Sequence, residues 1–289
     1  MQRHIPRVAS RVSGRLSFLQ SIEPLMIPGA LILLALLFIA IFCTWIAPYP
    51  PVYEDIANQL LPPSREHLFG TDHMGRDIFS RVLYGTRISI SISLLVMLVV
   101  LALGGSTGLL AGYFGGWVDA GIIRLADLFF AFPPLILALA IAAALGGGLF
   151  SALIAVGFAS WPFYARLVRS VTLAVRQEPY VEAARSMGGS EYHIMAKHVL
   201  PNCIGPILVQ ASMDIGWFLL YAASLSFIGV GAQQPTPEWG LMVSGGRKYI
   251  VDQWWVSAFP GAAIFITVLG FSLVGESLRD MLDPRLRRR

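Results

Sequence analysis

Charged residues are scarce in this sequence. Asp, Glu, Lys and Arg make up 13% of the 289 residues, whereas 56% are hydrophobic and the mean hydropathy is +0.67. Soluble domains carry about 25% charged residues, roughly twice this share. A water-soluble monomer of this length could not bury so much apolar surface. The composition therefore excludes a soluble enzyme and predicts an integral membrane protein.

Cysteine is rare and the common catalytic motifs are missing. Only Cys43 and Cys203 are present, which excludes a disulfide framework. The sequence has no Gly-x-x-x-x-Gly-Lys phosphate loop and no His-Glu-x-x-His zinc motif, and its five histidines form no metal-ligand set. One nucleophile-like pattern, Gly-x-Ser-x-Gly at 104–108, lies inside an apolar run with no strand before it. We therefore predict no catalytic residue, metal or cofactor on this chain.

Long uncharged runs predict an all-α membrane protein with six spans, because about 20 apolar residues cross the hydrocarbon core as a helix. The first run is too long for a signal peptide and ends without a small-residue cleavage site. The predicted spans lie in 27–47, 88–118, 128–165, 206–230 and 254–275. The run 128–165 is long enough for two short spans, with the glycines at 146–148 as the turn between them.

Lys and Arg are unevenly distributed between the segments that join these spans. With the N-terminus placed in the cytoplasm, the inside segments 1–26, 113–124, 166–203 and 277–289 hold 15 of the 21 basic residues, and the outside segments hold 6. Basic residues favour the cytoplasmic side of a membrane. Both termini inside also agrees with an even number of spans. The basic excess is thus a topology signal and does not indicate nucleic-acid binding.

Basic residues recur every four positions before the first span, at Arg3, Arg7, Arg11 and Arg15. Apolar residues fall on a neighbouring helical face, so the pattern favours a basic amphipathic helix lying on an anionic cytoplasmic leaflet. A disordered basic tail is the alternative.

Glycines also recur every four residues in the second span, at Gly104, Gly108, Gly112 and Gly116. Small residues at this spacing allow a close helix approach, so we expect this face to pack against another span.

A polar and aromatic stripe follows one face of the fifth span. Its members are Gln210, Asp214, Trp217, Tyr221 and Ser224, at steps of four and three residues. A carboxylate is costly in hydrocarbon, so Asp214 should face protein or water. The stripe either lines a translocation path, where Asp214 meets a cationic substrate group or holds a gate, or forms an internal hydrogen bond to Ser or Thr on a neighbouring span.

The inside segment 166–203 contains signals for a short, sharply bounded helix. Pro179 suits the first helical position and Gly188 suits a left-handed helix end. Between them Tyr180, Val181, Ala184 and Met187 supply an apolar face. Such a helix can insert into a groove on a partner protein. A second helix should run from Ser190 to His198 and stop before Pro201.

These residues resemble a known family. Glu182-Ala183-Ala184, then Gly188, then Leu200-Pro201 match the EAA loop of binding-protein-dependent ABC importer permeases, although His198 stands where the family pattern has Ile. The resemblance implies that this segment is the coupling helix that docks on an ATP-binding subunit. The residues that it assigns to this contact are Glu182, Ala183, Ala184, Arg185, Met187 and Gly188.

Three further segments narrow the resemblance to the dipeptide, oligopeptide and nickel permeases. They are 68–81 (including Leu68-Phe69-Gly70-Thr71-Asp72), 229–240 and 278–285. The chain is most similar to the second permease of the pair. Within these segments Gly70, Gly75 and Asp72 favour a tight turn, and Asp77 is expected to pair with Arg76 or Arg81. Pro235, Pro237, Glu238 and Trp239 are expected in an ordered loop at the outer mouth, with Trp239, Trp254 and Trp255 in the interfacial aromatic belt.

The resemblance implies the type I ABC importer permease architecture in a bacterial inner membrane. It implies a homologous permease partner, two ATP-binding subunits that hold ATP and Mg, and a solute-binding protein that is periplasmic or lipid-anchored. The expected organisation is a cytoplasmic segment 1–26, a first span and outer loop 27–87, a five-helix core 88–277 with the coupling loop 166–203, and a basic cytoplasmic tail 278–289. Dipeptides or short oligopeptides are the expected substrates, with nickel chelates, glutathione or opines as alternatives. A secondary transporter would need an ion site and internal repeats, which the sequence does not show.

Overall fold

The computed structural model describes residues 25–282, and within them it is almost entirely helical, with one isolated bridge between Thr71 and Asp77. The amphipathic helix expected before residue 25 and the basic tail after residue 282 lie outside the described residues. The helices are α2 (Met26–Ile46), α3 (Ile78–Val100), α4 (Ser106–Phe114), α5 (Gly116–Phe130), α6 (Pro134–Ala144), α7 (Leu149–Arg176), α8 (Pro179–Ser186), α9 (Glu191–Ile194), α10 (Leu200–Ile228), α11 (Trp239–Gly246) and α12 (Trp255–Leu282).

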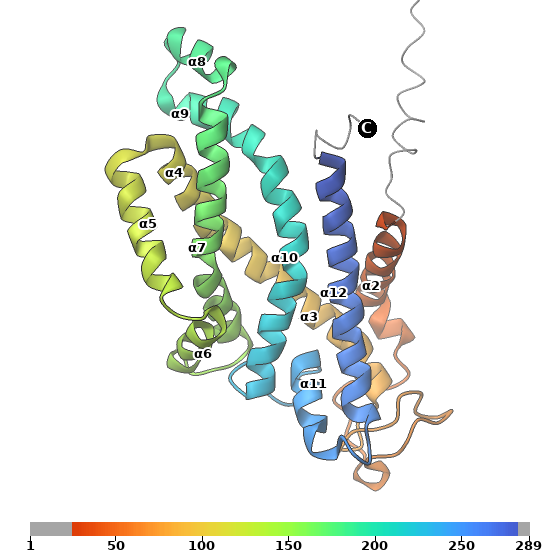
Figure 1. Cartoon of the computed structure of the whole chain (residues 1–289). Coiled ribbons are helices and arrows are strands. Elements are labelled where there is room, and N and C mark those ends of the chain that lie inside the picture. Colours follow the sequence, from red (N-terminus) through yellow and green to blue (C-terminus); the bar gives the residue numbers. More distant parts are fainter. Residues whose placement is uncertain (1–24, 283–289) are drawn as a thin grey trace, which may run out of the picture.

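The helices form one elongated bundle around α10 (Figure 1). On one side α10 packs against α12 and α3, and α2 covers α12 and α3 from outside. On the other side α10 packs against α7, which also carries α4, α5 and α6. The start of α2, the end of α12 and the pair α8–α9 lie at one end of the bundle, and α11 lies at the opposite end with the loop that joins α2 to α3 (Figure 1). We call these the α8 end and the α11 end.

Several of the helices that are long and apolar enough to span a membrane have other bounds than the predicted spans. Five helices qualify alone, and α5 and α6 qualify as a pair bent by 89°. The predicted third span is therefore a broken helix that begins at Gly116 rather than after Asp127. Pro133 and Pro134 break it, since proline cannot continue a helix from the preceding turn. The second span begins at Ile78 rather than after Arg87, because Asp77 caps α3 by accepting a hydrogen bond from the Ser80 backbone N–H at 2.7 Å.

The helix that follows Ser190 does not stop before Pro201, contrary to the prediction. It passes through a π-helical turn at Met195–Val199 and continues directly into α10, with Pro201 in the first turn of the new helix. Proline has no backbone N–H to donate. Pro201 is tolerated because the change from π to α hydrogen bonding leaves one residue at the junction that need not donate a backbone hydrogen bond. The segment after α8 and the fifth span are therefore one continuous helical rod.

The glycine face of the second span packs as predicted at three of its four positions. A Cβ on Gly104 would lie 2.5 Å from the Trp161 carbonyl oxygen, and Cβ atoms on Gly108 and Gly112 would meet α7 at similarly short distances. The backbones of α4 and α7 are thus in direct contact, as small residues permit. Gly116 does not belong to this face, because it has a φ of +56° and begins α5 instead.

Candidate functional site

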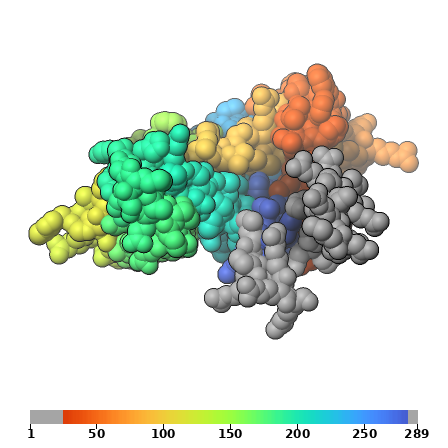
Figure 2. Space-filling view, turned by 90° about the horizontal axis from the view of Figure 1, so that it is seen from above, coloured from red at the N-terminus to blue at the C-terminus, as the bar shows by residue number. Residues whose placement is uncertain are grey.

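The α8–α9 hairpin has the local structure that its sequence predicts. Pro179 is at the first position of α8, and Gly188 follows the helix with a φ of +81°, in the left-handed region that side chains with a Cβ avoid. Ser190 caps α9 by accepting the backbone N–H of His193 at 3.4 Å. Seen from the α8 end, α8 and α9 (green to turquoise) are grouped apart from α2 (Figure 2).

The apolar face of α8 does not act as one surface, contrary to the expectation. Val181 and Ala184 are buried against the chain's own apolar cluster, which includes Tyr113 and Ile194. Ala184, at 6% exposure, is therefore not available to another protein in this conformation. The side chains of Tyr180, Glu182 and Ala183 are exposed to solvent, as is Met187 at the end of the helix, which is 83% exposed. The same short helix thus carries buried side chains that anchor it and exposed side chains that point away from the bundle.

A polar clamp, formed by Tyr113, Arg185 and Glu191, ties the hairpin to the end of α4. The Arg185 guanidinium donates to both oxygens of Glu191 at 3.0 and 3.2 Å, and the Tyr113 hydroxyl donates to the same carboxylate. Arg176, at the end of α7, lies 5.9 Å from the Tyr113 ring centre. The clamp thus joins the end of α8 and the start of α9 to the end of α4.

At the α11 end, a buried ionic network holds the loop that precedes α3. Asp72 accepts from the backbone N–H groups of Met74 and Arg76 and from the Arg76 guanidinium at 2.8 Å. Arg76 also reaches the Gln234 side chain at 2.9 Å. The expected pairing of Asp77 with an arginine is wrong, because Asp77 caps α3 and contacts the His67 ring nitrogen at 2.9 Å. The tight turns at Gly70 and Gly75 are confirmed by φ values of +76° and +75°.

Arg81 joins the loop that precedes α11, at 229–238, to this network. Its guanidinium donates to the carbonyl oxygens of Pro51 at 2.6 Å and Pro235 at 3.2 Å. The side chain of Arg81 is only 1% exposed, and hydrogen bonds to several carbonyls compensate its burial. The loop between α2 and α3 and the loop before α11, far apart in sequence, are therefore joined into one cap at the α11 end.

Most residues expected at the outer mouth lie inside this cap. Pro235 is exposed, whereas Pro237, Glu238 and Trp239 are buried. Glu238 caps α11 through the N–H groups of Gly240 and Leu241, at 2.9 and 2.8 Å. Burial raises the pKa of Glu238, and these hydrogen bonds act in the opposite direction.

Two of the three tryptophans predicted in the interfacial aromatic belt are buried inside the protein. Trp239 donates its ring N–H to the Val82 carbonyl oxygen at 3.0 Å and is fully buried, and Trp255 is also buried. Trp254 remains exposed. The tryptophans of this cap therefore mainly serve packing, with their N–H groups directed inward.

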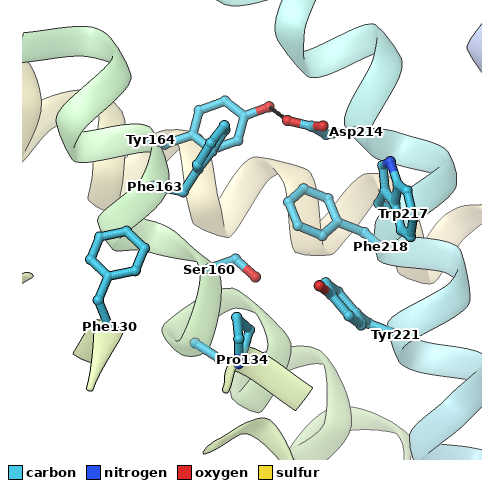
Figure 3. Close-up of a pocket in the computed structure, with 10 residues that line it drawn as sticks. Phe130, Pro134, Ser160, Phe163, Tyr164, Asp214, Trp217, Phe218 and Tyr221 are labelled. Carbon is cyan, nitrogen blue, oxygen red and sulfur yellow. Dashed lines mark hydrogen bonds between the residues drawn. The ribbon is translucent and has the colours of Figure 1, made fainter. Parts of the chain in front are cut away.

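A pocket of about 210 Å³ opens between α10 and α7, with Phe130 and Pro134 completing its wall (Figure 3). Asp214, Trp217 and Tyr221 of the predicted stripe line it, whereas Gln210 and Ser224 do not. Asp214 accepts a hydrogen bond from the Tyr164 hydroxyl at 2.8 Å, so a bond to a neighbouring span exists, with Tyr in place of the expected Ser or Thr.

Gln210 and Ser224 serve α10 itself. Gln210 donates to both Asp214 oxygens at 3.1 Å, one turn away. The Ser224 hydroxyl donates to the Leu220 carbonyl oxygen at 2.7 Å and has no partner outside its own helix among the residues that the structure describes. Three members of the stripe thus line the pocket, and the other two make hydrogen bonds within α10.

Comparisons with known proteins agree with this architecture. Residues 104–288 match the family described as binding-protein-dependent transport system inner membrane component. The chain is 47% identical over 97% of its length, and 94% of the relative's, to the probable D,D-dipeptide transport system permease protein of Escherichia coli K12. It is 43% identical to a dipeptide transport system permease protein of Alkalihalophilus pseudofirmus (91% and 86% covered) and 45% identical to a glutathione transport system permease protein of Pectobacterium atrosepticum (90% and 87% covered).

Two solved structures share the fold. A chain of the MetNI methionine ABC transporter in inward-facing form superposes with a TM-score of 0.57 at 20% identity, covering 71% of this chain and 98% of that one. A chain of an amino acid ABC transporter crystallised with histidines gives 0.54 at 19% identity, covering 73% and 95%.

The apolar helices, the capped hairpin and these likenesses define a multi-pass membrane permease component of an ABC importer, a class that works with ATP-binding and substrate-binding partners. The chain belongs to the binding-protein-dependent transport system inner membrane component family.

Proposed function

We propose that this chain forms half of a translocation path, with a homologous permease as the other half. Two ATP-binding subunits contact the α8 end, and a solute-binding protein, periplasmic or lipid-anchored, delivers substrate at the α11 end. ATP and Mg are held by the ATP-binding subunits, and this chain contributes no catalytic residue and no metal site. Both termini and the segment 166–203 are cytoplasmic in the bacterial inner membrane, which is the side that the basic residues favour.

The observation that carries this proposal is the division of α8 into an anchored and an exposed face. Val181 and Ala184 fix the helix to the bundle, while Glu182, Ala183 and Met187 project from it. Exposed apolar side chains on a short, capped helix are typical of a helix that enters a groove on another protein. Arg185 and Gly188 contribute by holding the hairpin in shape, through the clamp and the left-handed turn.

The α11 end differs from the α8 end in a way that suits delivery of a substrate. Arg76 and Arg81 lock its two loops together, so the cap is a rigid surface that a binding protein can contact. The chain is organised as 1–26, 27–77, 78–277 and 278–289, in which the core begins at Ile78, where α3 begins, and not at 88.

The translocation path follows the face of α10 that carries Asp214, Trp217 and Tyr221. ATP-driven closure of the ATP-binding subunits moves α8, and the continuous rod formed by α9 and α10 carries this movement to the pocket. The energy of ATP can be used only if the inward-open and outward-open states differ in their contacts at α8.

Short peptides are the substrates that we propose. Two of the relatives above are named as dipeptide transport permeases, at 47% and 43% identity. Glutathione is the second candidate, since a third relative of similar identity is named as a glutathione transport permease.

Gly188 offers a direct test of the coupling role. Gly188→Leu places a Cβ in the left-handed region, at a cost of about 1–2 kcal/mol to the turn, and should abolish peptide uptake and substrate-stimulated ATP hydrolysis in the reconstituted complex. Gly188→Asn is the matched control, because asparagine tolerates this conformation. Wild-type uptake and stimulation by an assembled Gly188→Leu complex would refute the assignment.

A further inference from the structure

Asp214 lies in the middle of α10, the helix that carries the predicted fifth span and runs from Leu200 to Ile228. At about 1.5 Å of rise per residue, it is roughly 21 Å from either end of the helix. The hydrocarbon core is about 30 Å thick, so a residue at the middle of a helix of this length is expected within the depth of the membrane.

Two neutral donors hold this carboxylate in place. Tyr164 donates to Oδ2 at 2.8 Å, and Gln210 donates to both oxygens at 3.1 Å. Within residues 25–282, no Lys, Arg or His nitrogen lies within 4 Å of it. By contrast, the acids of α5 are paired, Asp119 with Arg169 and Asp127 with Arg166. Asp214 thus has oriented oxygens but no opposite charge from the described chain.

Ionisable groups in membrane spans typically pair with one another or serve a ligand. A carboxylate offers about four lone-pair positions, and the hydrogen bonds from Tyr164 and Gln210 do not close all directions of approach. Figure 3 shows Asp214 at one end of the pocket, with side chains of α7 on one side and of α10 on the other. A cation in the pocket would reach the carboxylate directly.

The rest of the pocket suits an organic ammonium. Its wall is mostly aromatic, and its polar groups besides Asp214 include the hydroxyls of Ser160 and Tyr221. The aromatic members are Phe130, Phe163, Tyr164, Trp217, Phe218 and Tyr221. Aromatic faces attract cations that are large and weakly hydrated, and a carboxylate adds a charge-assisted hydrogen bond. The α-amino group of a peptide, with an ordinary pKa of about 8, is such a cation at neutral pH.

We propose that this pocket binds the protonated amino terminus of the transported peptide, with Asp214 as the residue that recognises it and Tyr164 and Gln210 as residues that position its carboxylate. The proposal rests on the proposed function, because it takes short peptides as the substrate. At about 210 Å³ the pocket accommodates one end of a peptide and leaves the remainder in the path.

The test uses the assembled complex in nanodiscs without nucleotide, with Ser160→Cys as the reporter. Cys43 and Cys203 are fully buried, so the complex with wild-type Ser160 gives the background labelling. Labelling by a small thiol reagent is measured against increasing Ala-Ala and against propionyl-alanine, which is the same molecule without the amino group. Adding the compounds directly bypasses the selectivity of the binding protein.

Ala-Ala should protect Ser160→Cys at a concentration at least about tenfold lower than propionyl-alanine, as the loss of a hydrogen bond to a charged group implies. In the Asp214→Asn background this difference should disappear. The control Ser224→Ala, on the same helix but outside the pocket, should keep it.

Equal protection by both compounds, or no protection by either, overturns the proposal. An unreactive Ser160→Cys also overturns it, because the partner permease then fills the pocket and supplies the counter-charge. Peptide uptake by the same reconstituted complex distinguishes a failure of the proposed binding site from a failure of the proposed transport function. Uptake of Ala-Ala without amino-dependent protection contradicts the site and leaves the importer proposal intact, whereas uptake of glutathione but not of dipeptides contradicts the proposed substrate.

Discussion

The contact between α4 and α7 allows a quantitative prediction at Gly108. A Cβ on this residue would lie 2.9 Å from the Val168 Cβ and closer still to the Ala165 carbonyl oxygen. Neither group is the far end of a flexible side chain, so the helices must move apart or their backbones must bend. Overpacking of this kind destabilises by about 1–3 kcal/mol. At roughly 2–4 °C per kcal/mol for a chain of this size, Gly108→Ala should melt several degrees below the wild type.

The assay is the thermal unfolding of the purified complex, followed by the loss of its monodisperse elution peak. Gly105→Ala is the matched control, since a Cβ there meets nothing within 4 Å. Alanine favours the helix over glycine by up to about 1 kcal/mol, so this control should be neutral or slightly stabilising. If Gly108→Ala melts at the same temperature as Gly105→Ala, then α4 and α7 are not in direct contact in the assembled protein.

Two further predictions concern the polar groups at the ends of the bundle. Glu191→Gln should weaken the clamp and lower substrate-stimulated ATP hydrolysis about fivefold, which is the lower limit for a typical coupling energy. Its basal ATP hydrolysis should stay at the wild-type rate, and the control Tyr192→Phe should keep both the basal and the stimulated rate. Burial lowers the pKa of His73 below its ordinary value of 6.5, partly opposed by Asp72. The unfolded chain therefore binds a proton first as the pH falls, and the stability that neutral His73 contributes is present above pH 6.5 and lost below it. Melting temperatures should fall more steeply below about pH 6.5 for the wild type than for His73→Gln, and parallel curves would show that His73 is not buried in the complex.

Local sequence signals predicted the features that follow from backbone conformation alone, namely the ends of α8 and the glycine face of the second span. Pro179 and Gly188 bound α8 because each residue type has a restricted or unusual φ, which acts without help from distant residues. The glycine face at Gly104, Gly108 and Gly112 was predictable because helix geometry alone places residues four apart on one side. The same rule failed at Gly116, where the chain leaves α4 and turns into α5.

Charge-free runs predicted the spans less well, because arginine and aspartate can enter a span when they are paired. Asp119 and Asp127 lie on α5 and pair with Arg169 and Arg166 of α7. Because of these charges, the uncharged run did not include α5, the first half of the broken span. Arg81 likewise lies inside α3, where carbonyl groups from distant segments accept its hydrogen bonds. Such partners come from tertiary contacts that no local pattern reveals.

The same limit applies to the candidate sites. The spacing of the stripe identified Asp214, but its partner Tyr164 is on another helix and carries no periodic signal. The clamp formed by Tyr113, Arg185 and Glu191 was also missed, since Glu191 reads as an ordinary first-turn acid. Trp239 was expected at the membrane interface because tryptophan favours that position, yet packing in the cap places it in the interior.

Cross-linking shows which end of the bundle meets the ATP-binding subunits. Met187→Cys at the α8 end and Trp254→Cys at the α11 end are both exposed, whereas the native cysteines are buried. Each variant is coupled to a photoreactive thiol reagent in the assembled complex and then illuminated. We predict cross-links from Met187→Cys to an ATP-binding subunit and none from Trp254→Cys, which should instead link to the solute-binding protein when that protein is added. Cross-links to the ATP-binding subunits from Trp254→Cys, or their absence from Met187→Cys in an active complex, would contradict the proposed coupling role of α8.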